Sequence, residues 1–427
     1  MGKIQETWEE RKGFRLHFIP TKKFKTNTIV VKFRSSLDRE TISKRALLSS
    51  ILDKGTINYP SSLDLRRALD YLYGAVLSID SSKKGNNHIL SIRLELPNDT
   101  YIQNESNLLE DALNLLKEII FQPNVENQSF PDQIVEREKK NMVAKIQSIK
   151  DDKMSLANMR LLDIMFENDP YSLHVQGYEE DLSNINGKNL YENYQSMISE
   201  DEMDIYFVGH REVEEIRTLI DDLFSRSVSS SVRSVQENNL SDQRDFQKVI
   251  EEDDVQQAKL HIGYRTPITF KDENYYVLQV FNGLFGGFPS SKLFMNVREK
   301  HSLAYYASSR FESHKGLLLV FSGVAPDKLE QAETIIDEQL EEMKKGNFTK
   351  EQLEETKSLV KSQISETFDQ AQGIIEVLYH QVISGKRISV EEMIEKIESV
   401  QKKQVTNVAK QVEKDTTYIL TAARGEK

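Results

Sequence analysis

The sequence predicts an α+β fold of two homologous domains, each a mostly antiparallel sheet packed with helices on one face. A chain of 427 residues is too long for one ordinary core and suits two domains of about 200 residues. Short runs of β-branched and aromatic residues alternate with long amphipathic patterns in both halves. A polar, serine-rich stretch at 225–247 separates them. We therefore predict an N-terminal domain 1–226, a linker 227–250 and a C-terminal domain 251–427.

The first half begins with two strands rich in β-branched and aromatic residues, which we expect to pair. Helical patterns follow, then two further strands, two long amphipathic helices and a returning strand. The expected strands are 13–20, 28–35, 75–82, 87–96 and 203–209, and the expected helices are 41–53, 62–73, 105–121 and 131–167.

The second half repeats this order of elements. We expect strands at 257–265, 303–312, 316–324 and 416–423, and helices at 273–285, 289–300, 327–344 and 350–384.

One landmark aligns the two halves directly. Pro60-Ser61-Ser62 matches Pro289-Ser290-Ser291 at an offset of 229 residues, which also places Ala75 on Ala304. A repeat this long indicates duplicated domains rather than a solenoid, whose period is about 20–50 residues.

Composition excludes several classes of function. The chain has no cysteine, so disulfides, thiolate zinc sites and cysteine nucleophiles are absent, and a reducing cytoplasm is the expected location. A net charge of −12 argues against nucleic acid as a partner. No apolar run is long enough to span a membrane, and the N-terminus lacks the apolar core of a secretory signal. We expect a soluble protein with neither a nucleic-acid nor a membrane partner.

Three local patterns have ordinary structural interpretations. Gly283–Gly287 lacks the residues of a phosphate-binding loop and predicts a tight turn between two helices. Ser290-Ser291 is typical of a helix N-cap, and no base or nucleophile elbow accompanies it. His301 and His314 are thirteen residues apart, on what we expect to be neighbouring strands. Such a pair is more often core or solvent-facing than metal-binding.

The most informative segment is 290–309, SSKLFMNVREKHSLAYYASS, which places Arg298 and Tyr305 across a helix end and the start of a strand. It resembles the Arg/Tyr segment in the C-terminal half of pitrilysin-type metallopeptidases. The resemblance covers nearly the whole chain, and its other pieces are Phe33–Asp38, Lys54-Gly55-Thr56, Glu136–Lys139 and Phe285–Phe294.

Active members of that family carry an inverted zinc motif, His-x-x-Glu-His, followed by a distant acidic ligand. Counting back from Lys54, the two histidine positions fall on Ala46 and Ser50, and the catalytic glutamate position falls on Ser49. The third ligand position falls on Lys145. A methyl group, two hydroxyls and an ammonium are poor zinc ligands. The resemblance therefore implies a family member without metal, cofactor or peptidase activity.

The resemblance also implies a role for Arg298 and Tyr305, whose counterparts in active relatives are thought to contact substrate. An Arg fork and a phenol suit a peptide carbonyl. The alternative is that Arg298 pairs with a nearby acid and Tyr305 packs in the sheet.

We expect a non-catalytic subunit that binds or positions a peptide or protein substrate. Its partner would be an active zinc-bearing paralogue in a heterodimer, or a second copy in a homodimer. The resemblance is closest to bacterial members associated with elongation factor P modification. A scaffold role, like that of the core subunits of the respiratory cytochrome complex, is the alternative, and an independent protease with unorthodox chemistry is the least favoured.

Overall fold

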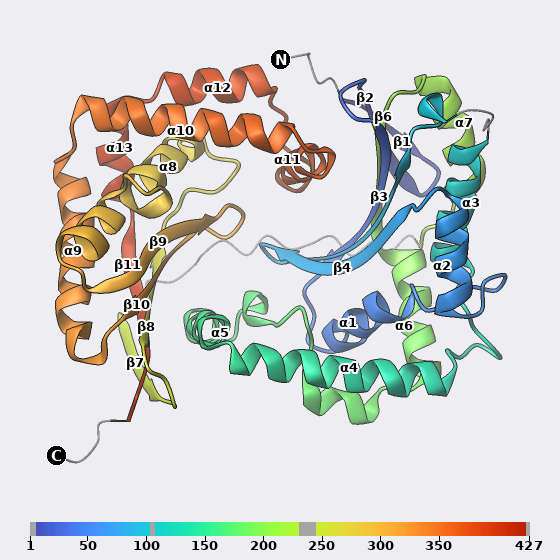
Figure 1. The fold of residues 1–427 in the computed structure, drawn as a ribbon, viewed down its shortest axis with the longest axis horizontal. Coiled ribbons are helices and arrows are strands. Elements are labelled where there is room, and N and C mark those ends of the chain that lie inside the picture. The colour runs from blue at the N-terminus through green and yellow to red at the C-terminus, as the bar shows by residue number, and fades with distance from the viewer. Residues whose placement is uncertain (1–5, 103–106, 230–244, 424–427) are drawn as a thin grey trace. The chain divides into compact units, whose positions relative to one another are not determined.

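A computed structural model describes residues 6–102, 107–229 and 245–423. The chain forms two compact units, each built around its own sheet (Figure 1). The first unit comprises Met1–Ser148 and Leu173–Glu237, and the second comprises Ile149–Ser172 and Asn238–Lys427. Residues 149–172 thus belong to the second unit although they lie within the N-terminal half of the sequence.

The first unit holds a six-stranded sheet in the order β1-β2-β6-β3-β5-β4. Its strands are β1 Thr7–Arg11, β2 Phe14–Pro20, β3 Thr26–Ser36, β4 Val76–Lys84, β5 Asn87–Pro97 and β6 Glu202–Gly209. Its helices are α1 Ile42–Ile51, α2 Ser62–Tyr71, α3 Leu108–Phe121, α4 Asp132–Asp151, α6 Gly187–Glu200 and α7 Val213–Phe224, with short 3₁₀ turns at Asp99–Tyr101 and Glu179–Asn184.

The expected pairing of the first two predicted strands is wrong. β6 lies between β2 and β3, parallel to β2 and antiparallel to β3. The reason is the apolar character of β6, whose residues after Glu202 are all buried. Such a strand belongs in the centre of a sheet, so it separates two strands that are neighbours in sequence.

The second unit holds a five-stranded sheet in the order β7-β11-β8-β10-β9. Its strands are β7 Gln247–Glu252, β8 Ala258–Arg265, β9 Ala304–Glu312, β10 Leu317–Val324 and β11 Glu413–Thr421. Its helices are α5 Lys153–Met165, α8 Tyr275–Asn282, α9 Leu329–Lys345, α10 Lys350–Phe368, α11 Ala371–Ser384, α12 Val390–Glu398 and α13 Lys402–Ala409. Two π-helical segments, Gly283–Gly287 and Phe294–Lys300, and 3₁₀ turns at Pro170–Ser172 and Pro326–Lys328 complete it.

The two sheets share one topology. In each sheet the last strand in sequence lies between two earlier strands, parallel to one and antiparallel to the other. β6 lies in this way between β2 and β3, and β11 lies between β7 and β8. The five strands β2, β6, β3, β5 and β4 therefore correspond in order to β7, β11, β8, β10 and β9. Ala75 precedes β4 and Ala304 begins β9, as the aligned landmarks require. The prediction of two homologous α+β domains with mostly antiparallel sheets is confirmed.

The helix expected over 131–167 is two helices. Asp152 caps the second of them, because its carboxylate accepts a hydrogen bond from the Met154 N–H. This second helix, α5, packs on β8 and β11 through Ala157, Leu161 and Met165. Gly263 of β8 permits the approach, since a Cβ there would lie 2.0 Å from the Met165 sulfur.

Both faces of the second sheet are covered. Tyr264 of β8 meets Phe285, whose π-helical segment contacts α8 and α9. These two helices lie on one face of the sheet (Figure 1). Neighbouring Gly263 faces α5, because successive strand residues point to opposite faces. This arrangement goes beyond the expectation of helices on a single face.

Most of the predicted linker lies outside the described residues, which omit 230–244. Its last part begins β7, which starts at Gln247 and pairs in parallel with β11. Alternating burial along β7 shows a strand with one face against the protein. Within the described residues, no helix has the length and apolar character needed to cross a membrane.

Candidate functional site

Three of the positions predicted to correspond to the zinc motif, Ala46, Ser49 and Ser50, lie on α1, which packs against β4 and α6. Ala46 belongs to the hydrophobic core and is 8% exposed. The Ser49 hydroxyl donates a hydrogen bond to the Ala46 carbonyl at 2.7 Å, so its proton is used within the helix. Ser50 is half-buried. On this surface of α1, Ala46 packs in the core and Ser49 is hydrogen-bonded within the helix. The surface offers neither an imidazole nor a carboxylate as a metal ligand.

A buried cation occupies the residue next to Ala46. Arg45 is 4% exposed, donates from Nε to His88 Nδ1 at 2.6 Å and pairs with Asp201 at 2.7 Å. Burial and the Arg45 charge hold the pKa of His88 well below its usual value. His88 is therefore neutral, and the nitrogen that faces Arg45 is an acceptor already in use. A histidine, His88, does lie next to α1, but its Nδ1 accepts a hydrogen bond from the Arg45 guanidinium.

Lys145 lies on α4 and is exposed. One turn earlier, Met142 lies against Gly177, as does Ser43 of α1, so the two helices approach each other there. Gly177 has φ +76° and leaves no room for a side chain. Across the described parts of the chain, no group of three or more histidine, aspartate or glutamate side chains is placed to hold a metal ion.

Arg298 lies in the π-helical segment Phe294–Lys300, and its side chain is 42% exposed. Its guanidinium lies over the Phe294 ring, 4.5 Å from the ring centre, and its Nε is 3.6 Å from a Glu299 carboxylate oxygen. The stacked ring limits the rotamers of Arg298 while the fork stays accessible. In the alternative interpretation, Arg298 pairs with a nearby acid. Glu299 is such an acid, but its contact with Arg298 is long and exposed to water.

Tyr305 is the second residue of β9 and is 77% exposed. A tight turn precedes it, with Ser302 at φ +51° and hydrogen bonds from Ser302 and Leu303 back to Arg298 and Val297. The alternative in which Tyr305 packs within the sheet is wrong, because strand alternation turns its neighbour Tyr306 inward instead. Burial and the charge of Asp152 raise the pKa of Tyr306 to about 12.

Two local expectations are corrected. Gly283–Gly287 is not a tight turn: it continues α8 as a π-helical segment, whose Gly286 lies against Leu293 and Ser309. His301 and His314 do not lie on neighbouring strands, because His301 precedes β9 and His314 lies between β9 and β10. His314 meets His380 of α11, with Nε2 and Nδ1 2.7 Å apart and the rings stacked at 4.9 Å. A contact across 66 residues leaves no local pattern in the sequence.

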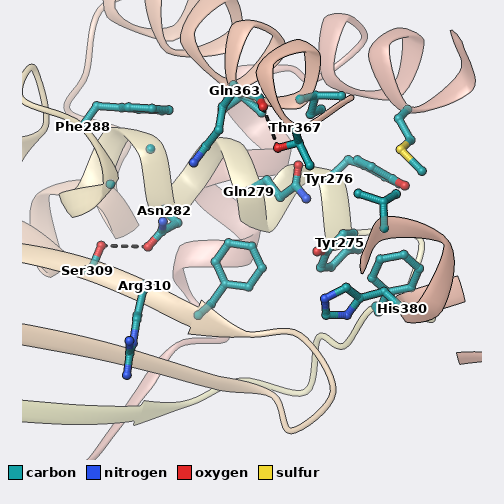
Figure 2. A pocket seen from close by; sticks show the side chains of 18 of the residues that line it. Tyr275, Tyr276, Gln279, Asn282, Phe288, Ser309, Arg310, Gln363, Thr367 and His380 are labelled. Atoms are coloured by element: carbon teal, nitrogen blue, oxygen red, sulfur yellow. Dashed lines mark hydrogen bonds between the residues drawn. The ribbon is translucent and has the colours of Figure 1, made fainter. Parts of the chain in front are cut away.

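Sequence reasoning also missed a cavity of about 410 Å³ in the second unit (Figure 2). It lies between α8, β9, α10 and α11. Several of its lining residues, among them Gly283, Gly287, Phe288 and Ser309, lie in segments singled out in the sequence, but nothing there indicated a cavity. The available signal was Gln279, an amide within the otherwise apolar run of α8.

Comparisons with known proteins identify the family. A family model described as "Peptidase M16 inactive domain" matches residues 184–360. Over 425 residues the chain is 42% identical to "Probable inactive metalloprotease YmfF" of Bacillus subtilis (strain 168), and the match covers 100% of both chains. The chain belongs to the peptidase M16 family.

Two further similarities extend over most of the chain. It is 24% identical over 309 residues to "Uncharacterized zinc protease YmxG" of the same Bacillus strain, covering 70% of this chain and 72% of the relative. The crystal structure of a conserved protein from Enterococcus faecalis V583 superimposes with a TM-score of 0.92 at 34% identity, over 99% of this chain and 100% of that one. The resemblance to pitrilysin-type peptidases is confirmed, as is the interpretation as an inactive metallopeptidase homologue.

Proposed function

We propose that this M16 protein binds and positions a peptide or protein substrate as the non-catalytic partner of an active, zinc-bearing homologue. The supporting observation is a contrast between two sites. Ala46 lies in the core and the Ser49 hydroxyl is bonded within its helix, whereas Arg298 and Tyr305 remain accessible. A homodimer is the alternative assembly.

The chemistry of the accessible pair suits a peptide backbone. A guanidinium donates through a planar fork and a phenol donates one hydrogen bond, and both fit a carbonyl oxygen. The Phe294 ring under Arg298 reduces the entropy that ordering this side chain would cost. These groups can orient a substrate but cannot cleave it, since neither activates a water molecule.

The choice of partner rests on the relatives. The chain is similar both to a protein named a probable inactive metalloprotease and to one named a zinc protease, from one Bacillus strain. We propose that this protein pairs with an active M16 protein of its own cell, and that the pair acts in elongation factor P modification.

Reconstitution tests the proposal. The active M16 protein from the same cell is purified with and without this chain, and its cleavage of a peptide library is measured. Cleavage should rise when the chain is added. Arg298→Ala should lower this stimulation about tenfold and Tyr305→Phe about fivefold, because each removes hydrogen bonds to the substrate. Tyr101→Phe, at another exposed tyrosine, is the matched control and should change nothing.

Other outcomes separate the competing roles. Complex formation with unchanged cleavage would favour the scaffold role, and cleavage by the chain alone would favour an independent protease. Association only with itself would favour the homodimer. The link to elongation factor P requires that deleting the gene alter the mass of that factor, and an unchanged mass would refute the link alone.

A further inference from the structure

The cavity in the second unit has aromatic walls. It lies between α8 and α10, with β9 beneath and α11 at one end (Figure 2). Phe270 and Phe311 pack around Tyr275, at 4.7 Å and 5.8 Å between ring centres. The His380 ring stacks on Phe270 and is hydrogen-bonded to His314. A volume of about 410 Å³ is within the range of small-ligand pockets.

Two amide side chains of α8 face this space from one side of the helix. Gln279 Oε1 is buried and has no hydrogen-bond partner among the described groups. Asn282 Oδ1 accepts from the Ser309 hydroxyl at 2.8 Å, which leaves its NH₂ group as the donor. The two residues are three apart and therefore about one helical turn from each other. The cavity thus offers one acceptor and one donor side by side.

Among the described residues, no carboxylate, ammonium or guanidinium is directed into the cavity. Arg310 contributes to its lining, but its side chain points away from the helices (Figure 2) and lies over the Phe321 ring at 4.9 Å. The other polar groups of the lining carry no carboxylate, ammonium or guanidinium: they are the amide of Gln363, the hydroxyls of Thr367, Tyr275, Tyr276 and Ser309, and the ring of His380, which is hydrogen-bonded to His314. An ionised ligand would lose its hydration here without a compensating charge, so the lining selects against ions.

A π-helical segment forms one wall of the same cavity. Gly283 and Gly287 both line it, and both belong to the segment Gly283–Gly287. Such segments are rare, cost backbone stability and occur frequently at functional sites. The segment is a second observation, independent of the orphaned amide oxygen, that singles out this place.

We infer that the cavity is a binding site for a neutral aromatic group that carries an amide. The ring would fill the aromatic part, the ligand N–H would donate to Gln279 Oε1, and the ligand C=O would accept from Asn282. An aromatic residue within a peptide and a free aromatic amide share this chemistry. The inference does not depend on the proposed role of Arg298 and Tyr305, which do not line the cavity.

Calorimetric titration of the full chain with blocked amino acids tests the inference. N-acetyl-phenylalaninamide, which is neutral, should bind saturably with a Kd of about 0.1–1 mM, as its size allows. N-acetyl-phenylalanine, an anion, and phenylalaninamide, a cation, should bind at least about tenfold more weakly. A capped pentapeptide with a central phenylalanine separates the sources: tighter binding identifies a peptide segment, and equal binding identifies a free amide.

Two variants and a control locate the site. Gln279→Met keeps the volume but removes the acceptor, and Gln363→Trp fills the space from α10. Each should weaken binding about tenfold or more. Ser362→Trp places the same bulky group on the neighbouring, exposed position of α10 and should leave the Kd unchanged.

Thermal unfolding checks whether each variant is folded. If either Gln279→Met or Gln363→Trp fails to fold, the other variant still tests the site. The inference is overturned if no neutral probe binds or if the charged analogues bind equally well. It is also overturned if the folded variants bind with the wild-type Kd.

Discussion

The two units share a strand order but differ in how they stabilise buried polar groups. In the first, His17 of β2 is enclosed by carboxylates, with Nδ1 2.6 Å from Glu6 and Nε2 3.0 Å from Asp204. In the second, His261 of β8 is equally buried, and neither ring nitrogen has a hydrogen-bond partner among the described groups. A duplicated fold fixes the apolar pattern, and the polar interior of each copy is then free to diverge.

The same contrast applies to the buried Arg–Asp pairs. Arg45 and Asp201 are 5% and 7% exposed in their side chains, whereas Arg265, the partner of Asp415, is 19% exposed and also bonds the Met165 carbonyl. The more completely a charge is enclosed, the more its partner matters. This difference between the units can be tested by identical substitutions in each.

The largest expected effect is that of Asp201→Ala. It leaves the Arg45 guanidinium buried without a counter-charge, at a cost of about 3–5 kcal/mol. Asp415→Ala in the second unit should cost less, about 1–3 kcal/mol, because Arg265 reaches water and keeps a carbonyl partner. Urea unfolding measures both. Trp8, the single tryptophan, reports the first unit by fluorescence, and circular dichroism follows the whole chain. Equal losses would contradict the comparison.

Replacing each buried histidine by leucine should give effects of opposite sign. His17→Leu strips Asp204 and Glu6 of their shared partner and should destabilise the protein by about 3 kcal/mol. His261→Leu removes two unsatisfied nitrogens and should be neutral or stabilising by up to about 1 kcal/mol. The unfolding midpoints at pH 7 check both. A large loss for His261→Leu would reveal a partner for this ring.

The two histidines should also give opposite dependences on pH. Burial and the charges of Lys259 and Arg310 lower the pKa of His261 to about 3. As pH falls, His261 is therefore protonated in the unfolded chain before it is protonated in the folded protein. The free energy of unfolding falls by up to about 1.4 kcal/mol per pH unit as pH drops from 6.5 towards 3.

Burial opposes a charge on His17, but its hydrogen bonds with Asp204 and Glu6 prevail and raise its pKa. Its contribution is present below pH 6.5 and is lost as pH rises through the raised value. The difference between wild-type and each leucine variant, measured from pH 5 to 8, isolates the two slopes. If the two differences had the same dependence on pH, the opposite pKa shifts of His17 and His261 would be refuted.

A smaller effect tests the packing of α5 on the second sheet. Gly263→Ala places a methyl group against the Met165 sulfur and should cost about 1–3 kcal/mol as the thioether repacks. Gly74 in the first unit, unlike Gly263, sits at positive φ, and no atom lies within 4 Å of a Cβ added there. The cost of Gly74→Ala, about 1 kcal/mol, is therefore backbone strain alone. Met165→Ala should relieve Gly263→Ala in a double-mutant cycle, and additive losses would contradict the contact.

The smallest expected effect concerns metal. Because α1 presents Ala46, Ser49 and Ser50, a chelator should leave the unfolding midpoint unchanged, and purified protein should hold far less than one zinc per chain. Mass spectrometry under native conditions and elemental analysis check this. A stoichiometric ion would reverse the interpretation of the first unit.

The edge strands β1 and β7 were not predicted. The positions of the other strands were predictable because each concentrates β-branched and aromatic residues, as the run at 28–35 does. The break between α4 and α5 was not predicted, although Asp152 is a capping residue, because 132–167 contains neither glycine nor proline. Helix α6 was missed despite its Asn186 capping box.

Side-chain partnerships were the least predictable part. Arg45 meets Asp201 across 156 residues and His314 meets His380 across 66, and no periodicity in the sequence encodes such contacts. The degenerate zinc positions could be assigned from the sequence because the assignment uses only local spacing from Lys54, and it stays a prediction. The cavity could not, since its walls come from separate elements that only the folded chain brings together.

The membership of α5 in the second unit has a consequence during synthesis. The ribosome releases α5 well before it has made β8 or β11, the strands that cover Leu161 and Met165. Until then this helix exposes an apolar stripe, and a fragment that stops at the linker would expose it permanently. Separate production of the halves therefore calls for a gene that grafts residues 149–172 onto the C-terminal piece.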